Sequence, residues 1–245
     1  MKPVVRYARN VAKRVIPKRW VYAVRKYFEK RAYAVVGRRN WLERPNTPED
    51  NHVEVYWKTA DHPNRIVLTD TLCKLLSGSK RRPLSVLEFG SHVGVNLHNL
   101  RRAFTGELAI FAVEPNRPAA DSLREKLPGV RLLVAEDEVF TERDDFPEVA
   151  ISVSFVNAVF YCMDEMRTKN VLRKLARISE VIVIGDEFDN IDGRTSLRDP
   201  EQFSYQHPFA TWLREFGFSE IRHLEVPEPK YAIRGLLVAS RPPPF

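Results

Sequence analysis

Apolar runs of six to eight residues alternate along the chain with segments whose apolar positions follow helical spacing. The runs predict strands over 83–89, 107–113, 130–135, 149–156 and 180–185. The segments between them predict helices over 95–104, 116–127 and 164–178. Apolar strands separated in this way by helices or compact links are typical of a parallel sheet that is covered on both faces.

The C-terminal end departs from this alternation. A helix over about 206–216 leads to an apolar strand over 218–226, and the loop PEPK connects it to another strand over 231–240. Two strands joined by so short a link are expected to pair antiparallel. A further helix over 62–77 precedes the first strand. The pattern therefore predicts seven strands, mostly parallel, with an antiparallel hairpin at the C-terminal end.

The first strand runs into a glycine turn, in the sequence VLEFGSHVGVNL. Ligands of open α/β sheets bind beyond the carboxyl ends of the strands, near such a turn. A dinucleotide site needs glycine in the middle of the turn, where the backbone approaches the pyrophosphate, but His92 stands there. The Gly-Lys-Ser/Thr ending of a P-loop is also absent. NAD, FAD and nucleoside triphosphates are therefore disfavoured.

Acidic residues follow the next two strands. Glu114 comes 24 residues after Gly90, and an acid at about this spacing binds the hydroxyls of a ribose. Glu136 and Asp137 follow the third strand, where they could accept from the amino group of adenine. For these two residues a solvated acidic face is an alternative, and for Glu114 an exposed acid beside Pro115. A site that binds adenosine and has no loop for phosphates suits S-adenosylmethionine.

These segments resemble class I S-adenosylmethionine-dependent methyltransferases. VLEFGSHVG resembles the first motif of that family, AIFAVEPN the second, VAEDE the third-strand motif and ISVSFVNAVFY the fourth. The resemblance covers about 60–240 and implies a Rossmann-like doubly wound sheet of order 3-2-1-4-5-7-6. His92 departs from the usual glycine. The cofactor-binding residues that the resemblance implies are Glu88, Gly90, Ser91, His92, Gly94, Asn96, Glu114, Glu136, Asp137 and Phe155.

Candidates for the chemical step lie at the ends of the fourth and fifth strands. Methyl transfer needs an aligned nucleophile and, for a hydroxyl, a group that removes its proton. Tyr161 follows strand four, Asp186 and Glu187 end strand five, and His207 begins the helix after the irregular stretch 188–205. That stretch is long enough to form a lid. We expect these four residues to be catalytic or to bind the acceptor, with a helix start without chemistry as the alternative for His207.

Composition and charge narrow the class further. A chain of 245 residues that is 44% hydrophobic forms one domain of ordinary size with attachments. Its two cysteines, Cys73 and Cys162, form no CxxC or His/Cys cluster, so we expect no metal site and a reducing, cytoplasmic compartment. The first forty residues carry a net charge of +12, and the rest therefore −5, since the whole chain carries +7. An acidic main domain argues against nucleic acid as a partner.

The basic N-terminal segment predicts a separate role. Residues 1–33 show two amphipathic helical patterns hinged at Pro17, with aromatic residues among the Lys and Arg. Such helices lie on anionic membrane surfaces. Packing on the domain, a nucleic-acid arm and a targeting peptide are the alternatives. No apolar run reaches the roughly 18 residues of a membrane span. We divide the chain into an extension, 1–45, and a methyltransferase domain, 46–245.

The sequence as a whole favours a methyltransferase that is peripheral on the inner face of a membrane. Its acceptor would be a small or lipid-linked molecule, and the resemblance suggests a sugar of a surface polysaccharide. A methyltransferase-shaped binding or scaffold module without turnover is the alternative, and His92 favours it. A nicotinamide oxidoreductase is disfavoured by the turn around His92.

Overall fold

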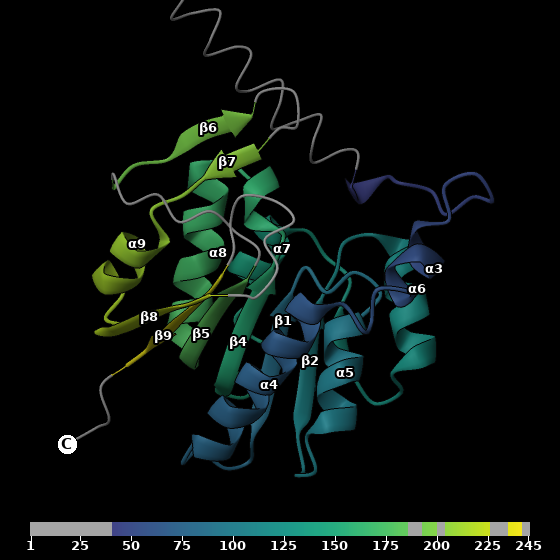
Figure 1. Cartoon of the computed structure of the whole chain (residues 1–245). Helices are drawn as coiled ribbons and strands as arrows, with labels where there is room; N and C mark the ends of the chain where they lie inside the picture. The colour runs from purple at the N-terminus through teal and green to yellow at the C-terminus, as the bar shows by residue number, and fades with distance from the viewer. Residues whose placement is uncertain (1–40, 186–192, 200–203, 226–234, 242–245) are drawn as a thin grey trace, which may run out of the picture.

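The computed structural model describes residues 41–185, 193–199, 204–225 and 235–241, and its main feature is a seven-stranded sheet (Figure 1). The strands are β1 (Ser85–Phe89), β2 (Ala109–Val113), β3 (Arg131–Leu133), β4 (Ile151–Asn157), β5 (Ser179–Gly185), β8 (Glu220–Glu225) and β9 (Gly235–Ser240). Their order is β3-β2-β1-β4-β5-β9-β8, and β9 runs in the direction opposite to the other six strands. Since β8 and β9 are the sixth and seventh strands of this sheet, the predicted order and hairpin are confirmed.

Helices cover both faces of the sheet (Figure 1). They are α3 (His52–Trp57), α4 (Pro63–Gly78), α5 (Val95–Ala103), α6 (Arg117–Lys126), α7 (Asp137–Glu142), α8 (Glu165–Ile178) and α9 (Phe209–Glu215). Side chains of a strand alternate between its faces. Val86 of β1 therefore packs in a core with α4, α5 and α6, while Leu87 and Phe89 pack in another core with α7, α8 and α9. All five residues of β1 are buried, including the polar residues Ser85 and Glu88.

Five elements differ from the prediction. The predicted irregular stretch 188–205 contains an antiparallel hairpin of β6 (Ser196–Asp199) and β7 (Ser204–Gln206), so that interpretation was wrong for its described part. These strands are too short to show an alternating apolar pattern. Helices α3 and α7 have six residues each and were not predicted. Helix α9 begins at Phe209, so His207 precedes the helix and does not begin it.

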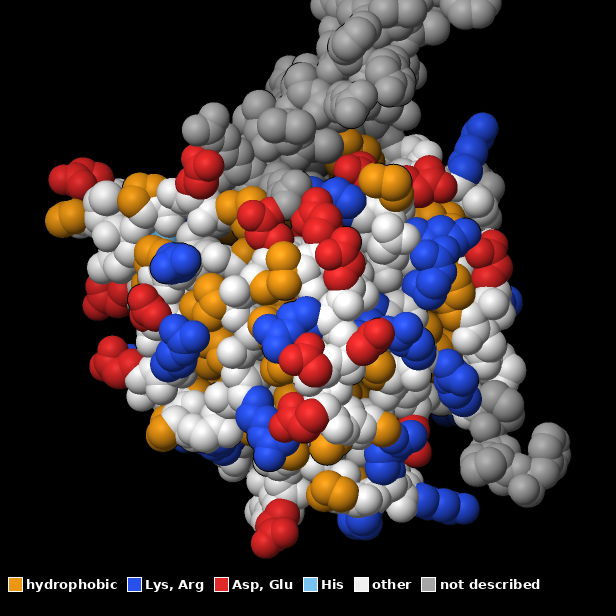
Figure 2. Space-filling view, turned by 180° about the vertical axis from the view of Figure 1, so that it is seen from behind, with side chains coloured by type: hydrophobic (Ala, Val, Ile, Leu, Met, Phe, Trp, Pro, Cys, Tyr) orange, Lys and Arg blue, Asp and Glu red, His pale blue; other side chains and the backbone are white. Residues whose placement is uncertain are grey.

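The described surface carries charges of both signs. On the face shown in Figure 2, Lys and Arg are interspersed with acids over the lower part, and acidic side chains predominate along the upper edge. This mixture fits the net charge of −5 that the sequence gives to residues after 40. Among the described helices, none combines the length and the apolar character needed to cross a bilayer. The predicted N-terminal helices lie outside the described residues and remain a prediction.

Candidate functional site

The glycine turn lies at the carboxyl end of β1, next to β2. The backbone N–H groups of Gly90 and Ser91 both donate to the carbonyl of Val113, at 2.9 and 3.1 Å. Gly90 has a φ of +74°, and a Cβ at this position would lie 2.4 Å from Cγ2 of Val159. Glycine is required there, because the left-handed backbone disfavours a side chain and the close contact with Val159 leaves no room for a Cβ. The turn thus fixes the backbone that faces a ligand.

Glu88 is a buried carboxyl group with one oxygen left unpartnered. Its side chain is 1% exposed, and Asn96 of α5 donates its Nδ2–H to Oε1 at 2.7 Å. Arg65 of α4 in turn donates to Oδ1 of Asn96 at 2.5 Å. Oε2 of Glu88 is buried without a hydrogen-bond partner. Burial raises the pKa of Glu88 to about 8, because desolvation disfavours the charged form. An unpartnered buried oxygen of this kind suits a positively charged ligand group.

Glu114 follows β2 and turns toward the glycine turn. Oε2 accepts the backbone N–H of His92 at 2.7 Å, and Oε1 accepts that of Asn116 at 2.8 Å. The side chain is 5% exposed, and burial raises the pKa of Glu114 to about 7. Each carboxylate oxygen has a second lone pair. The group is therefore held in a fixed position and retains acceptor capacity for ligand hydroxyls.

His92 adopts the left-handed backbone in which glycine is usual, with a φ of +49°. Its ring is enclosed by residues 41–57, which we call the cap. Nε2 lies 2.9 Å from Nδ1 of His52, and the ring of Tyr56 lies 4.1 Å away between centroids. The ring of Trp41 completes the enclosure in a T-shaped contact, with 6.3 Å between the ring centroids. Burial lowers the pKa of His92 to about 3, so the ring is neutral.

Asn116 holds the other side of the cap. Its Nδ2 donates to the carbonyl oxygens of Trp41 and Arg44, each at 3.0 Å. Its Oδ1 accepts the N–H of Ala119 at 3.0 Å and so caps α6. Residues 41–44 therefore pack on the main domain, although the sequence division placed them in the N-terminal extension.

The turn brings together most of the predicted cofactor residues. Ser91 is buried with its hydroxyl 3.5 Å from the carbonyl of Val113, and Gly94 is the N-terminal cap residue of α5. Phe155 is different: it lies two residues before the end of β4, fully buried in the core with α4 and α5. Its side chain fills the core and is not exposed at the carboxyl edge. The residues around the turn are Glu88, Gly90, Ser91, His92, Gly94, Asn96 and Glu114.

Asp137 is held by a basic residue. Arg167 of α8 forms a bidentate pair with it, in which Nε donates to Oδ2 at 2.7 Å and Nη2 donates to Oδ1. Asp137 is 7% exposed and Arg167 13%. Glu136 is the N-terminal cap residue of α7 and is half-buried. The structure thus places Asp137 in a partly buried ion pair between α7 and α8, and Glu136 beside it at the carboxyl end of β3.

The acceptor half of the predicted site is described only in part. Asp186 and Glu187 lie outside the described residues. Tyr161 lies in the short 3-10 helix η1 (Phe160–Cys162), directly after β4, and is half-buried. It therefore lies at the carboxyl edge of the sheet, as its place in the sequence predicts.

His207 is completely buried, with an exposed fraction of 0%. Nε2 lies 3.1 Å from the carbonyl oxygens of both Phe160 and Met163, which assigns the proton to this nitrogen. Nδ1 then accepts from the hydroxyl of Thr195 at 3.2 Å. Burial lowers the pKa of His207 to about 4. With both nitrogens bonded inside the protein, the ring joins the segment before α9 to η1 and has no nitrogen directed to solvent.

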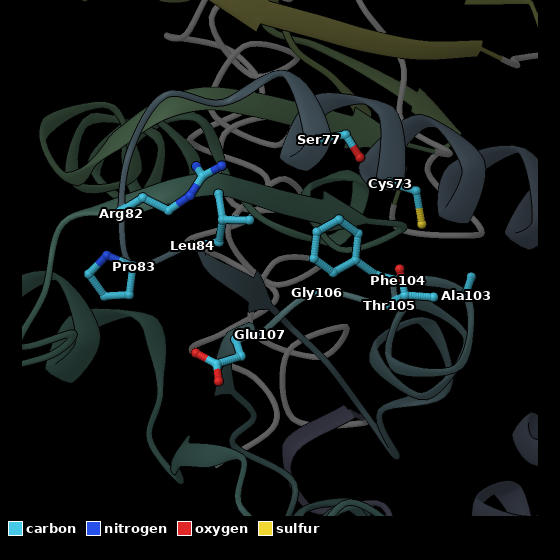
Figure 3. Close-up of a pocket in the computed structure, with 10 residues that line it drawn as sticks. All are labelled: Cys73, Ser77, Arg82, Pro83, Leu84, Ala103, Phe104, Thr105, Gly106 and Glu107. Atoms are coloured by element: carbon cyan, nitrogen blue, oxygen red, sulfur yellow. The ribbon is translucent and has the colours of Figure 1, made fainter.

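A hollow of about 580 Å³ lies at the opposite edge of the sheet (Figure 3). It is formed by the C-terminal ends of α4 and α5 and the segments that lead into β1 and β2. Its charged residues, Arg82 and Glu107, are exposed. The hollow contains none of the predicted site residues. Its lining residues are Cys73, Ser77, Arg82, Pro83, Leu84, Ala103, Phe104, Thr105, Gly106 and Glu107.

Four residues of the carboxyl edge were missed by sequence reasoning: Arg65, His52, Asn116 and Arg167. Asn116 carried a local signal, since Asn before Arg-Pro marks a helix start. That signal predicts that Oδ1 caps the helix. It does not predict the hydrogen bond that Nδ2 donates to the backbone carbonyl of residue 41. The other three act through contacts that span 30 to 40 residues, and no local pattern reports such contacts.

Comparison with known proteins identifies the fold. A scan against protein-family models and a search of curated proteins find no match to this sequence. Among solved structures, an amino pentose methyltransferase from Micromonospora echinaspora is similar over 77% of this chain and 96% of its own, with 14% identity and a TM-score of 0.55. The chain has the fold of class I S-adenosylmethionine-dependent methyltransferases.

Two further structures with this fold act on different acceptors. A sugar N-methyltransferase from Streptoalloteichus is 15% identical, with 77% of this chain and 92% of its own covered and a TM-score of 0.54. A magnesium protoporphyrin IX methyltransferase from Synechocystis, with S-adenosylmethionine bound, is 14% identical, with 90% and 96% covered and a TM-score of 0.54. The methyltransferase fold of this chain is therefore shared with enzymes of unlike acceptors.

Proposed function

We propose that this chain is an S-adenosylmethionine-dependent methyltransferase. The observation that carries the proposal is the pair of buried carboxyl groups, Glu88 and Glu114, at the carboxyl ends of the adjacent strands β1 and β2. Both are desolvated, and Oε2 of Glu88 has no partner. Buried carboxyls left in this state are costly unless a ligand uses them.

The residues present fit the cofactor. Oε2 of Glu88 would accept from the ammonium of its methionine part, and the free lone pairs of Glu114 would accept from its ribose hydroxyls. His92 fills the position that a dinucleotide needs empty, and S-adenosylmethionine has no phosphate to place there. The bound cofactor supplies a methyl group on a sulfonium. The chain itself would orient that group through the fixed turn.

Calorimetric titration with S-adenosylhomocysteine tests this proposal. We expect the wild type to bind and Glu114→Gln to bind about a hundred-fold more weakly, since two charge-assisted hydrogen bonds are weakened. Glu107→Gln is the matched control, because Glu107 is an exposed acid at the opposite edge of the sheet. No binding by the wild type, or equal binding by Glu114→Gln, would contradict the proposal.

For the acceptor, we propose a sugar that is small or lipid-linked. The support is the likeness in fold to a sugar N-methyltransferase and an amino pentose methyltransferase. The experiment incubates the protein with cofactor labelled in the methyl group and with separated lipid-linked and water-soluble sugar fractions. Label in a sugar product supports this class, and label only in protein or nucleic acid would overturn it.

We propose further that residues 1–40 hold the enzyme on the inner face of a membrane. The support is their net charge of +12 against −5 for the rest of the chain. Each basic residue near an anionic surface contributes about 1 kcal/mol. Sedimentation with phosphatidylserine-containing vesicles should be lost when residues 1–40 are removed, while affinity for S-adenosylhomocysteine is unchanged. Equal sedimentation of both proteins, or none with the full chain, would contradict this role.

A binding module without turnover is the second candidate. The observation that favours it is His207, whose two nitrogens are both bonded within the protein. A predicted base without an accessible nitrogen is unable to take a proton from an acceptor. Binding of S-adenosylhomocysteine together with no transfer of label to any cell fraction would select this candidate. Transfer to any fraction would exclude it.

A further inference from the structure

Two residues connect Glu114 to the cap, and they do so in the same way. His92 and Asn116 each donate a backbone N–H to one oxygen of Glu114, at 2.7 and 2.8 Å. The side chain of each then contacts the cap, residues 41–57. The carboxylate therefore depends for its position on two residues whose own positions depend on the cap.

The contact through His92 is specific to this residue type. The ring meets His52, Tyr56 and Trp41, and glycine at this position would offer them nothing to pack on. His52 is 2% exposed, and its ring nitrogen shares a hydrogen bond with His92. Because both rings are neutral, one nitrogen of the pair donates and the other accepts.

The contact through Asn116 fixes the start of the cap. Its side-chain amide donates hydrogen bonds to the backbone carbonyl oxygens of Trp41 and Arg44. Arg44 also forms a bidentate pair with Asp50, at 2.7 and 2.5 Å, which closes the segment between them. The cap is attached to the main domain at several points, since Trp57 also donates its Nε1–H to the hydroxyl of Ser122 on α6, at 3.2 Å. The attachments through His92 and Asn116 are the two that flank Glu114.

We propose that the cap positions Glu114 for the ribose of the cofactor through His92 and Asn116. This inference rests on the proposed methyltransferase function and adds His52 and the amide of Asn116 as positioning residues. Neither needs to touch the ligand. By linkage, a ligand that binds the positioned carboxylate also stabilises the docked cap.

Two variants break the two attachments separately. His52→Phe keeps an aromatic ring and removes the hydrogen bond to His92. Asn116→Asp keeps the oxygen that caps α6 and removes the donor to the cap carbonyls. Each should weaken S-adenosylhomocysteine binding about five-fold, the affinity equivalent of one net hydrogen bond. The matched controls, His223→Phe on β8 and Asn170→Asp on α8, are exposed and should bind within two-fold of the wild type.

A double-mutant cycle separates positioning from general destabilisation. His92→Gly should fold, because glycine adopts the positive φ of this position readily. In this background His52→Phe has no hydrogen bond to remove, so its effect on affinity should disappear. A merely structural effect of His52→Phe would add to that of His92→Gly instead.

Hydrogen exchange of the cap provides a second readout. S-adenosylhomocysteine should slow exchange of residues 41–57 in the wild type, and Asn116→Asp should speed it without ligand. The inference is overturned if the wild type binds and both variants bind as tightly as the wild type. It is also overturned if the ligand leaves hydrogen exchange of the cap unchanged. The methyltransferase proposal would survive either result. If the wild type binds no S-adenosylhomocysteine, the proposed function fails, and this inference fails with it.

Discussion

The two halves of the carboxyl edge treat their buried polar groups in opposite ways. Around β1 and β2, Glu88 keeps an unpartnered oxygen and Glu114 is held by backbone donors alone. Around the segment before α9, both nitrogens of His207 are bonded to protein groups. Unsatisfied buried groups are what a ligand completes, whereas satisfied ones stabilise the scaffold. The contrast between Glu88 and His207 supports the proposed ligand site at β1 and β2, whereas both nitrogens of His207 are bonded within the protein.

Glu88 and His207 also respond to pH with opposite sign. The pKa of Glu88 rises from 4.5 to about 8 in the fold, so its contribution to stability is present below pH 4.5 and is lost as the pH rises through 8. The pKa of His207 falls from 6.5 to about 4, so its contribution is present above pH 6.5 and is lost as the pH falls through 4. The alkaline limit of stability therefore reports on the carboxyl groups Glu88 and Glu114, and the acid limit reports on His207 together with His92.

The largest expected effect comes from replacing the histidine. His207→Ala leaves a cavity and removes the partners of two buried carbonyl oxygens and a hydroxyl. The free energy of unfolding should fall by about 3 kcal/mol, measured by urea denaturation. His223→Ala, at an exposed position, should change it by less than about 0.5 kcal/mol. A stable His207→Ala protein that binds cofactor but transfers no methyl group would show that His207 takes part in the reaction.

The next effect is a change in alkaline stability. Glu88→Gln keeps the shape of the side chain and removes its ionisation. Between pH 6 and 8 the ligand-free wild type should lose stability relative to this variant by about 1.4 kcal/mol per pH unit. Urea titrations at three pH values measure the difference. Parallel curves for the two proteins would show that the Glu88 carboxyl ionises normally and would remove the contrast between the halves.

The smallest expected effect is the release of a proton when the ligand binds. An ammonium placed against Glu88 favours the charged carboxylate and so lowers its raised pKa. Binding of S-adenosylhomocysteine at pH 7 should therefore release about one proton. Calorimetry in two buffers of different ionisation enthalpy gives the number, and Glu88→Gln should release fewer. Equal proton release by both proteins would show that the ammonium does not bind at this carboxyl group.

Much of this molecule follows from local sequence. The strands were predictable because β1 and β4 are buried on both faces and are rich in Val, Ile, Leu and Phe. The turn was predictable because Gly90 and Gly94 require left-handed backbone within one short segment. The place of Glu114 followed from its spacing after Gly90, since parallel strands end at the same edge.

The rest depends on contacts between distant parts of the chain. Asp137 follows β3 as predicted, but Arg167, thirty residues later, holds it in an ion pair. His207 precedes a helix as a catalytic residue could, but its partners come from Phe160 and Met163. Such partners are set by tertiary packing, which neither periodicity nor spacing encodes.

The contact between Gly90 and Val159 has an evolutionary consequence. Because no side chain fits between them, the residues that follow the first and fourth strands are unable to drift independently. In descendants of this chain, an enlargement at Gly90 would have to be accompanied by a reduction at Val159. Such paired changes would mark lineages in which the bend has been rebuilt for a ligand of another shape.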